Sequence, residues 1–583
     1  MKALTVYKAS AGSGKTFTIA VEYIKLLIND PLCFKNILAV TFTNKATEEM
    51  KLRILSQLYG IWKNLPESET YTKAVCDSLG ISPSMASFRA GRALNYLVHN
   101  YNYFMVETID SFFQSVLRNL ARELDLTANL KIGLNDVQVE EMAVDKLIES
   151  LTSTSIILKW LISYIFSNID DNKSWNVIGN VKDFGKTIFK DFYKKFGNEL
   201  NATVSKKGFF ESYTKELHTI KNNAKKRMAE YSETFKRETE NAGLSVTSYA
   251  NGTRGISSYF NKLRSDDFSD SKCVNSTLKK CLDDANCWAS KASPDRDAII
   301  SLVNNKLIKL LNDAETERRQ QWELYATADC TLRHLDKLRL LNSIEIKVRE
   351  LNHDANLFLL SDTQYLLHTM IKDNDSPFIF EKIGCRLEHI MIDEFQDTSS
   401  IQWQNFKVLL DECISRSGNQ GYVLGNKSTL INNLIVGDVK QSIYRWRSGD
   451  WRLLNNIEKQ FSGKGNEIDV KNLQTNYRSE RNIIDFNNSF FKIATKLEYE
   501  EECKTNDKQT SQELLDAYAD VEQKARNEEK DTAGLVRLAL LAGDDYKNEM
   551  LSWIDATIQE ILAEKIAEKD VAILVRYNQH IPI

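Results

Sequence analysis

The segment that opens the chain constrains the fold more than any other part of the sequence. An apolar run, Leu4–Tyr7, leads into a loop with Gly12 and Gly14, and apolar residues spaced as on one helix face follow from Ile19 to Leu27. A glycine loop between a strand and a helix is the arrangement that a phosphate-binding loop requires. We therefore expect a nucleotide to lie against the following residues: Ala9, Ser10, Ala11, Gly12, Ser13, Gly14, Lys15, Thr16 and Phe17.

The loop residues have the chemistry that binding of a nucleoside triphosphate needs. Gly12 and Gly14 allow backbone N–H groups to turn toward a phosphate, and the N-terminus of the following helix adds partial positive charge. Lys15 is expected to reach the β- and γ-phosphates of ATP, and the Thr16 hydroxyl to hold Mg²⁺. The general pattern begins with glycine where this chain has Ala9, which is a mild departure. The alternative is a glycine-rich turn that binds nothing.

A second acidic site indicates hydrolysis as well as binding. The apolar run Ile390–Ile392 predicts a strand, and it ends in Asp393 and Glu394. Asp393 is placed to meet Mg²⁺, and Glu394 to orient and deprotonate the attacking water. The alternative is an ordinary surface pair of carboxylates at the end of a strand.

The remaining pattern predicts an α/β protein with a helical insertion. Strand-like runs alternate with helix-like segments, which favours a parallel sheet, and Val571–Val575 predicts a late strand. The predicted parts are the first segment of an α/β domain at 1–125, a mainly helical insertion at 126–375, a second segment of the same domain at 376–464, and the start of a second α/β domain at 465–583.

Composition excludes several classes of protein. The formal net charge of -4 argues against a globally basic nucleic-acid coat, so any DNA contact must come from local patches. The nine cysteines form no CxxC pair, so we expect reduced thiols in a cytoplasmic protein. No apolar run approaches the ~20 residues that a membrane span needs.

Several further motifs resemble those of the UvrD/Rep-type superfamily 1 DNA helicases. They occur in the order of that family: Thr41–Ala46, Thr108–Phe112, Asp393–Thr398, Val436–Arg447, Asn476–Ser479 and Val571–Arg576. The form of the glycine loop is most similar to the RecB/AddA branch, whose members are helicase–nuclease subunits that process double-strand breaks. The resemblance implies a RecA-like motor domain, a helical insertion and the first part of a second RecA-like domain.

The resemblance also assigns roles around the nucleotide. Gln441 would sense the γ-phosphate, Arg478 would act as an arginine finger, and Tyr477 would stack on the adenine. The alternatives are a solvent-facing loop glutamine, a surface arginine and a packed core tyrosine.

DNA contacts need aromatic rings for bases and hydrogen-bond donors for phosphates. Phe42, Tyr444 and Trp446 are the stacking candidates, with ordinary core packing as the alternative. The candidates for holding the sugar–phosphate backbone are Thr41, Asn44, Ser111, Arg445 and Arg447. In the insertion, Lys186, Lys190 and Lys194 recur every four residues, which predicts one basic helical face.

The sequence thus predicts an ATP- and Mg²⁺-dependent helicase that moves on single-stranded DNA, with 3′-to-5′ polarity implied by the resemblance alone. Duplex DNA and a second helicase–nuclease subunit are the expected partners. The family's motifs V and VI do not occur, so we expect the chain to be the N-terminal part of a longer protein and the isolated piece to hydrolyse ATP weakly or not at all. The alternatives are an ATPase acting on a non-DNA partner and a nucleotide- and DNA-binding piece without turnover.

Overall fold

The computed structural model describes residues 3–120, 131–133, 136–170, 176–355, 357–373, 387–416, 432–461, 468–505, 508–526, 533–541, 545–577 and 580. The chain divides into two compact units. Unit 1 is Met1–Val6, Ile19–Val436 and Ser442–Asp469; unit 2 is Tyr7–Thr18, Gly437–Gln441 and Val470–Ile583. The two units do not test the four-part division predicted from the sequence, which stays a prediction.

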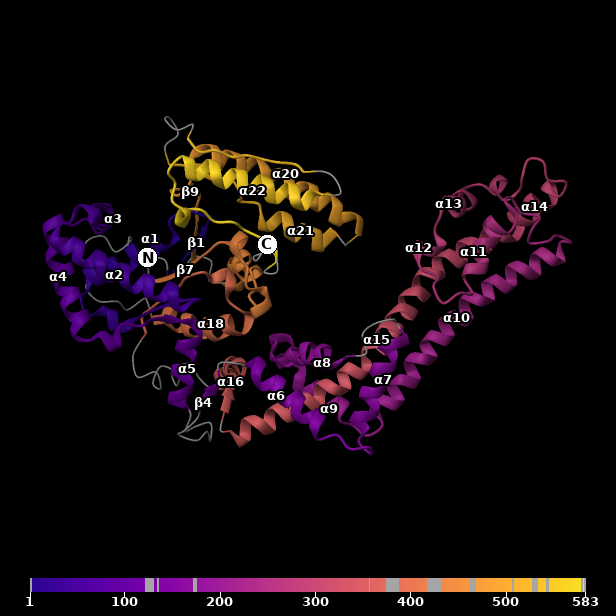
Figure 1. The fold of residues 1–583 in the computed structure, drawn as a ribbon, viewed down its shortest axis with the longest axis horizontal. Helices are drawn as coiled ribbons and strands as arrows, with labels where there is room; N and C mark the ends of the chain where they lie inside the picture. The colour runs from indigo at the N-terminus through magenta and orange to yellow at the C-terminus, as the bar shows by residue number, and fades with distance from the viewer. Residues whose placement is uncertain are drawn as a thin grey trace. The chain divides into compact units, whose positions relative to one another are not determined.

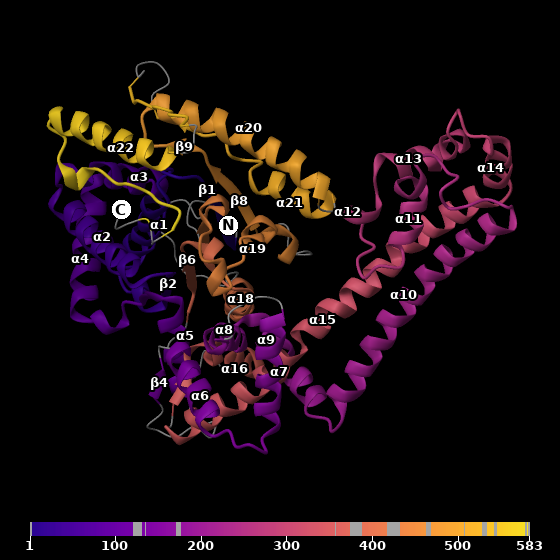
Figure 2. The ribbon, with the colours of Figure 1, turned by 45° about the vertical axis from the view of Figure 1, so that its right-hand side comes forward.

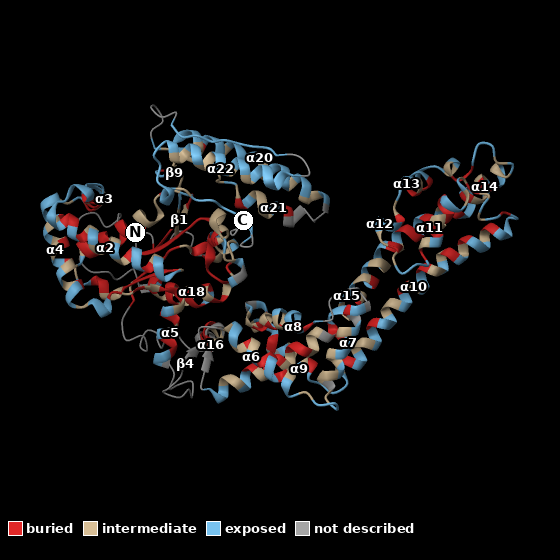
Figure 3. Cartoon of the chain, in the orientation of Figure 1, coloured by how far each residue is buried: buried red, intermediate tan, exposed pale blue. Residues whose placement is uncertain are grey.

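A six-stranded sheet has the strand order β3-β2-β6-β7-β1-β8. Strand β2 pairs in parallel with β3 and with β6, and β6 pairs in parallel with β7. Strands β2, β6 and β7 are buried along their whole length, as expected of continuous apolar runs covered on both faces (Figure 3). The predicted α/β class with a parallel sheet is therefore confirmed. The strands are β1 Leu4–Ala9, β2 Ile37–Thr41, β3 Val106–Thr108, β6 His389–Ile392, β7 Asn433–Gly437 and β8 Ile468–Leu473.

Helices connect these strands. Helix α1 (Lys15–Asn29) is buried continuously from Ile19 to Ile28. Helix α2 begins after Thr43, whose hydroxyl accepts a hydrogen bond from the backbone N–H of Ala46 at 3.1 Å. The remaining helices of this part are α2 Asn44–Lys63, α3 Glu69–Leu79, α4 Pro83–His99, α5 Ile109–Leu120 and α18 Ser400–Arg416.

A mainly helical region lies between β3 and β6 in the chain. Its entry strand β4 (Lys131–Gly133) and its exit strand β5 (Leu357–Leu359) pair in parallel. Two long helices, α10 and α15, run side by side in both Figure 1 and Figure 2. The helices are α6 Asp136–Glu149, α7 Ile156–Asp170, α8 Ile178–Gly185, α9 Asp191–Val204, α10 Phe209–Asn241, α11 Ile256–Lys262, α12 Asp270–Cys273, α13 Ser276–Asp283, α14 Arg296–Leu302, α15 Ile308–Asp354 and α16 Leu360–Asp373.

This region has two separate main cores. One gathers residues of α6 to α9 against the later part of α15, around Val144 and Ile344. The other lies where α10 ends and α15 begins, around Phe260 and Trp288. Beside it, the fully buried Arg318 pairs with Glu315 at 2.8 Å and with Asp270 at 2.5 Å, so its charge is compensated.

The predicted basic helical face at 186–194 is wrong. A 3₁₀ turn, Lys186–Phe189, ends at Lys190, whose extended backbone separates it from α9. Lys186 pairs with Asp183 at 2.8 Å, and Lys194 pairs with Asp362. The three lysines therefore lie on different elements, and two of them are neutralised by carboxylates.

The last part of the chain holds β9 (Thr475–Asn476), which pairs in parallel with β10 (Lys524–Ala525). Helices α20 (Arg481–Thr505), α21 (Lys508–Ala517) and α22 (Tyr546–Ala563) accompany them, and α22 has no buried residue (Figure 3). The predicted strand at 571–575 is not one: these residues have no regular secondary structure, and Leu574 is 94% exposed. A strand needs a hydrogen-bonded neighbour, and the described residues supply none there. No described helix is long and apolar enough to cross a membrane.

Candidate nucleotide site and nucleic-acid interface

The glycine loop between β1 and α1 has a backbone that only glycine adopts without strain. Gly12 has φ +72° and Gly14 has φ +83°, both in the left-handed region. The backbone N–H of Ser13 donates to the carbonyl of Ser10 at 3.2 Å, and the N–H of Ser10 donates back to Ser13 Oγ at 3.2 Å. Around the Cβ position of Gly14 nothing lies closer than 3.9 Å, which leaves the loop open there. The loop therefore has the turned, open backbone that exposes amides to an anion.

Lys15, the first residue of α1, contacts the predicted γ-phosphate sensor. Lys15 Nζ donates to Gln441 Oε1 at 3.1 Å. Gln441 Nε2 in turn donates to Asp438 Oδ2 at 2.7 Å, from a 3₁₀ turn, Val439–Gln441, that directly follows β7. The alternative of a solvent-facing glutamine is therefore excluded, since both ends of the Gln441 amide are engaged.

Lys440, to which the sequence assigned no role, lies beside this pair. Its ammonium contacts Asp438 at 3.1 Å and Asp520 at 2.8 Å. Burial acts to lower the pKa of Lys440, but the two carboxylates outweigh it and hold that pKa above its ordinary value. Lys440 therefore stays charged and ties the turn after β7 to the segment that follows α21.

The third group around the loop is Asn476-Tyr477-Arg478. The backbone N–H of Tyr477 donates to the carbonyl of Gly12 at 2.9 Å. A Cβ added to Gly12 would lie 2.6 Å from Asn476 Oδ1 and 2.9 Å from Arg478 Cβ, so only glycine fits there. The Tyr477 side chain is 60% exposed, which excludes a core position and leaves its ring available for stacking. A cavity of about 170 Å³ lies beside these residues and is lined also by Arg481 and Arg526.

The acidic pair predicted for hydrolysis lies in unit 1, directly after β6. Asp393 is buried and accepts a hydrogen bond from the backbone N–H of Glu394 at 2.9 Å. Glu394 has φ +49°, a left-handed conformation that costs of order 1–3 kcal/mol in a residue with a side chain. Such strain is typical of functional positions, and here it turns the chain sharply at the end of the strand.

Gln396 is a residue that sequence reasoning missed. Its Nε2 donates to Glu394 Oε2 at 2.7 Å, and its side chain is buried. The Gln396 carbonyl accepts a hydrogen bond from Ser442 Oγ at 3.3 Å. Gln396 thus fixes the Glu394 carboxylate and connects it to the segment after residue 441. Gln396 lies inside a quoted motif, but nothing in one sequence showed which way its amide points.

Three of the predicted DNA-contacting residues gather in unit 1. The rings of Phe42 and Tyr444 lie 4.4 Å apart between centroids with a 36° tilt. The Arg447 guanidinium lies 5.9 Å from the Phe42 ring and 6.0 Å from the Tyr444 ring. Both rings are half-buried and Arg447 is exposed, so the group presents aromatic and cationic surface together. The side chain of Trp446 lies outside what the structure describes.

The candidates for contacts with the sugar–phosphate backbone of DNA differ from one another in exposure. Asn44, Ser111 and Arg445 are exposed. Ser111 lies in the first turn of α5, on a polar cavity of about 450 Å³ lined also by Gln114, Ser115, Arg118 and Asn119. Thr41 differs, because it is fully buried and its hydroxyl bonds with Thr47 Oγ1 at 2.7 Å. In this conformation the Thr41 hydroxyl faces the protein, so the expectation that it holds a phosphate is not supported.

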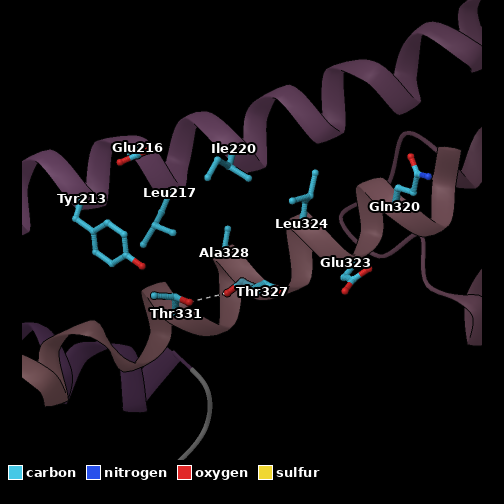
Figure 4. A pocket seen from close by; sticks show the side chains of 10 residues that line it. All are labelled: Tyr213, Glu216, Leu217, Ile220, Gln320, Glu323, Leu324, Thr327, Ala328 and Thr331. Carbon is cyan, nitrogen blue, oxygen red and sulfur yellow. Dashed lines mark hydrogen bonds between the residues drawn. The ribbon is translucent and has the colours of Figure 1, made fainter. Parts of the chain in front are cut away.

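A larger groove lies in the helical region of unit 1. It has a volume of about 600 Å³ and opens between α10 and α15 (Figure 4). Its lining combines apolar side chains such as Leu217 and Leu324 with Glu216 and Glu323. None of the predicted site residues lines it.

The parallel sheet, the glycine loop and the strained acidic pair define an α/β protein of the P-loop nucleotide-binding class. Residues 2–462 match the UvrD/REP helicase N-terminal domain, and the chain belongs to this family. The resemblance stated from the motifs is thereby confirmed.

Known relatives are helicase–nuclease subunits. The chain is 23% identical over 521 residues to an ATP-dependent helicase/nuclease subunit of Listeria monocytogenes, covering 83% of this chain and 37% of the relative. It is 25% identical over 536 residues to the corresponding ATP-dependent helicase/nuclease protein of Clostridium acetobutylicum, covering 83% and 38%. It is 24% identical over 525 residues to the RecB subunit of the RecBCD enzyme of Haemophilus influenzae, covering 84% and 40%. The chain thus spans about two fifths of the length of the relatives that it matches.

Proposed function

We propose that the protein is an ATP-dependent helicase that moves along single-stranded DNA, within a helicase–nuclease that acts in double-strand break repair. The observation that carries the proposal is the hydrogen bond between Lys15 and Gln441. It gives a phosphate-binding lysine a direct link to a turn that continues into Tyr444 and Arg447. Membership of the UvrD/REP helicase family and likeness to helicase–nuclease subunits support it.

The residues fit Mg²⁺ and ATP by the chemistry of their donors. Thr16 offers a hydroxyl oxygen and Asp393 a carboxylate oxygen, which are ligands that Mg²⁺ prefers. Bound Mg²⁺ would neutralise charge on the phosphate oxygens. The amides of Gly12 to Gly14 would cradle the phosphates, and Lys15 would leave Gln441 Oε1 to bind the β- and γ-phosphates.

The remaining residues would carry out hydrolysis. Glu394, held by Gln396 in the structure, would orient the water and accept its proton. Arg478 would neutralise charge that develops in the transition state, and Tyr477 would stack its exposed ring on the adenine. Gln441, released from Lys15, would contact the γ-phosphate. Its movement would shift the segment that follows it in the chain, up to Arg447.

DNA would be held by the aromatic and cationic group in unit 1. Phe42 and Tyr444 would stack on bases, Arg447 would pair with phosphate, and Asn44, Ser111 and Arg445 would hold the backbone. Trp446 is a further stacking candidate. Polarity of 3′-to-5′ and a partner subunit are carried over from the family resemblance, and a cytoplasmic location from the nine cysteines without a CxxC pair.

The test is ATP hydrolysis by the complete protein with and without single-stranded DNA. We expect DNA to stimulate turnover, and we expect duplexes with a 3′ tail to be unwound in preference to those with a 5′ tail. Turnover that ignores DNA would instead favour an ATPase with a different partner. Binding of nucleotide and DNA without turnover would favour a binding role.

A further inference from the structure

A glutamine that belongs to none of the motifs contacts the phosphate-binding loop. Gln523 precedes β10 in the chain, 46 residues beyond Tyr477. Its Nε2 donates to the carbonyl of Ala11 at 2.9 Å, and its Oε1 accepts a hydrogen bond from Asn476 Nδ2 at 2.8 Å. One side chain therefore joins the glycine loop to the segment that carries Arg478.

Gln523 is itself held in place. Its backbone N–H donates to Asn488 Oδ1 at 2.9 Å, and its carbonyl accepts a hydrogen bond from Asn488 Nδ2 at 2.9 Å. Asn488 lies on α20, so the backbone of Gln523 is fixed to a helix while its side chain spans to the loop. Because its backbone is fixed to α20, the Gln523 side chain can hold Ala11 and Asn476 in position.

Asn476 carries the connection on to Arg478. Its side chain is 5% exposed, and its Oδ1 accepts hydrogen bonds from the backbone N–H groups of Arg478 at 2.8 Å and Ser479 at 3.0 Å. With Nδ2 bound to Gln523, both ends of the Asn476 amide are satisfied. The orientation of this amide therefore determines the backbone conformation at Arg478. Gln523 in turn determines the orientation of the amide.

The contact to Ala11 bears on the phosphate-binding amides directly. A peptide group is planar and trans, so its C=O and N–H point in opposite directions. A bond to the Ala11 carbonyl fixes where the Gly12 N–H points, and the bond from Tyr477 N–H to the Gly12 carbonyl fixes the Ser13 N–H. Two successive carbonyls are thus held in place. Because the Ser13 N–H itself donates to the Ser10 carbonyl at 3.2 Å, the amide that Gln523 orients toward a phosphate is that of Gly12.

We propose that Gln523 is a positioning residue that couples the phosphate-binding loop to the arginine finger Arg478. It orients the Gly12 amide of the loop through Ala11 and the Arg478 turn through Asn476. Arg478 then faces the nucleotide that the loop amides bind. This inference rests on the proposed function, since it assumes that ATP binds at this loop.

The test compares two variants in the complete protein. Gln523→Met keeps the length of the side chain and removes both hydrogen bonds. Gln523→Glu keeps an oxygen that accepts from Asn476 Nδ2 but cannot donate to Ala11. The matched control is Glu522→Gln, which alters the adjacent exposed residue and its 2.7 Å pair with Lys492 without touching the network.

Three quantities separate positioning from stability: the Kd for Mg-ATP, kcat of DNA-stimulated hydrolysis, and Tm. We expect Gln523→Met to raise the Kd by about 3- to 10-fold, the value of one hydrogen bond. We expect its kcat to fall by about 10- to 100-fold, because Arg478 loses its alignment. Gln523→Glu should recover most of the kcat but not the affinity, and Glu522→Gln should match the wild type in all three.

An unchanged kcat and Kd in Gln523→Met would overturn the inference. So would an equal loss of kcat in both variants that follows their loss of Tm, since that indicates a structural role only. If the wild-type protein binds ATP but shows no DNA-stimulated turnover, the proposed function fails independently. The Kd of Gln523→Met against the control still decides whether Gln523 orients the loop.

Discussion

Glu140 of α6 is a buried carboxylate whose ionisation should loosen the insertion. Its side chain is fully buried, and neither carboxylate oxygen has a hydrogen-bond partner among the described residues. A Cβ on Gly185 would clash with Glu140 Oε1, so the carboxyl occupies space that only a glycine on α8 leaves free. Burial raises the pKa of Glu140 from its ordinary 4.5 to about 7, against a partial opposing effect of Lys186 and Lys182.

The sign of the effect follows from the direction of this shift. The native state binds the proton more tightly than the unfolded state does, so the stability that this proton provides is fully present below pH 4.5. It is lost as the pH rises through about 7. A change from 4.5 to about 7 corresponds to about 3 kcal/mol of stability lost at alkaline pH. Glu140→Gln, which cannot ionise, should avoid this loss.

Hydrogen exchange of the α6 amides provides the measurement, with both proteins compared at the same pH. At pH 8 we expect slower exchange in Glu140→Gln than in the wild type, by about 100-fold, which is what about 3 kcal/mol corresponds to. At pH 4, below the ordinary pKa of 4.5, the two should exchange alike. The control is Glu149→Gln, an exposed position on the same helix, which should show no difference at either pH. Equal protection of α6 at pH 8, or a difference that is the same at both values of pH, would refute the reasoning.

The remaining predictions concern the sites. Lys15→Ala should abolish hydrolysis, because the β- and γ-phosphates lose the cation of the loop; a phosphate-release assay that finds more than about a tenth of wild-type turnover would contradict the assignment. Glu394→Gln should still bind ATP but lose hydrolysis, since the amide cannot accept the proton; a collapse of nucleotide affinity, read by equilibrium titration, would make it a binding residue instead. Trp446→Ala should weaken single-stranded DNA binding by roughly 1–3 kcal/mol with little change in DNA-independent turnover, and unfolding of the variant would place the ring in a core. Phe42→Ala should weaken binding by a similar amount, measured by the same fluorescence-anisotropy titration, and an unchanged Kd would limit its role to packing on Tyr444.

Local pattern predicted the elements that are buried on both faces. Strands β2, β6 and β7 form from mainly apolar runs, and tertiary context only strengthens what such runs favour. The segment Val571–Val575 has the same pattern but no partner strand among the described residues. Its case shows that an apolar run supplies the tendency to form a strand, whereas the neighbour supplies the hydrogen bonds.

The directions of polar side chains explain what the sequence could not predict at the site. Lys15, Gln441 and Tyr477 were found because each lies in a motif. The Gln523 amide takes its direction from Ala11, far away in the chain, whereas the Gln396 amide bonds to the nearby Glu394 and the Thr41 hydroxyl is turned inward by Thr47. Spacing along one sequence contains no information about the direction of an amide or a hydroxyl.

The paired strands at the base of the helical insertion have an evolutionary consequence. Because β4 and β5 lie side by side, with Lys131 opposite Leu357, the chain leaves and returns at almost the same point. The insertion between these strands, which is more than two hundred residues long, can therefore be lengthened, shortened or exchanged without moving the strands that hold the nucleotide loop. Homologues can therefore diversify this insertion at a different rate from the parallel sheet. Because α10 and α15 pack against each other within the insertion, we expect the two helices to be gained or lost together.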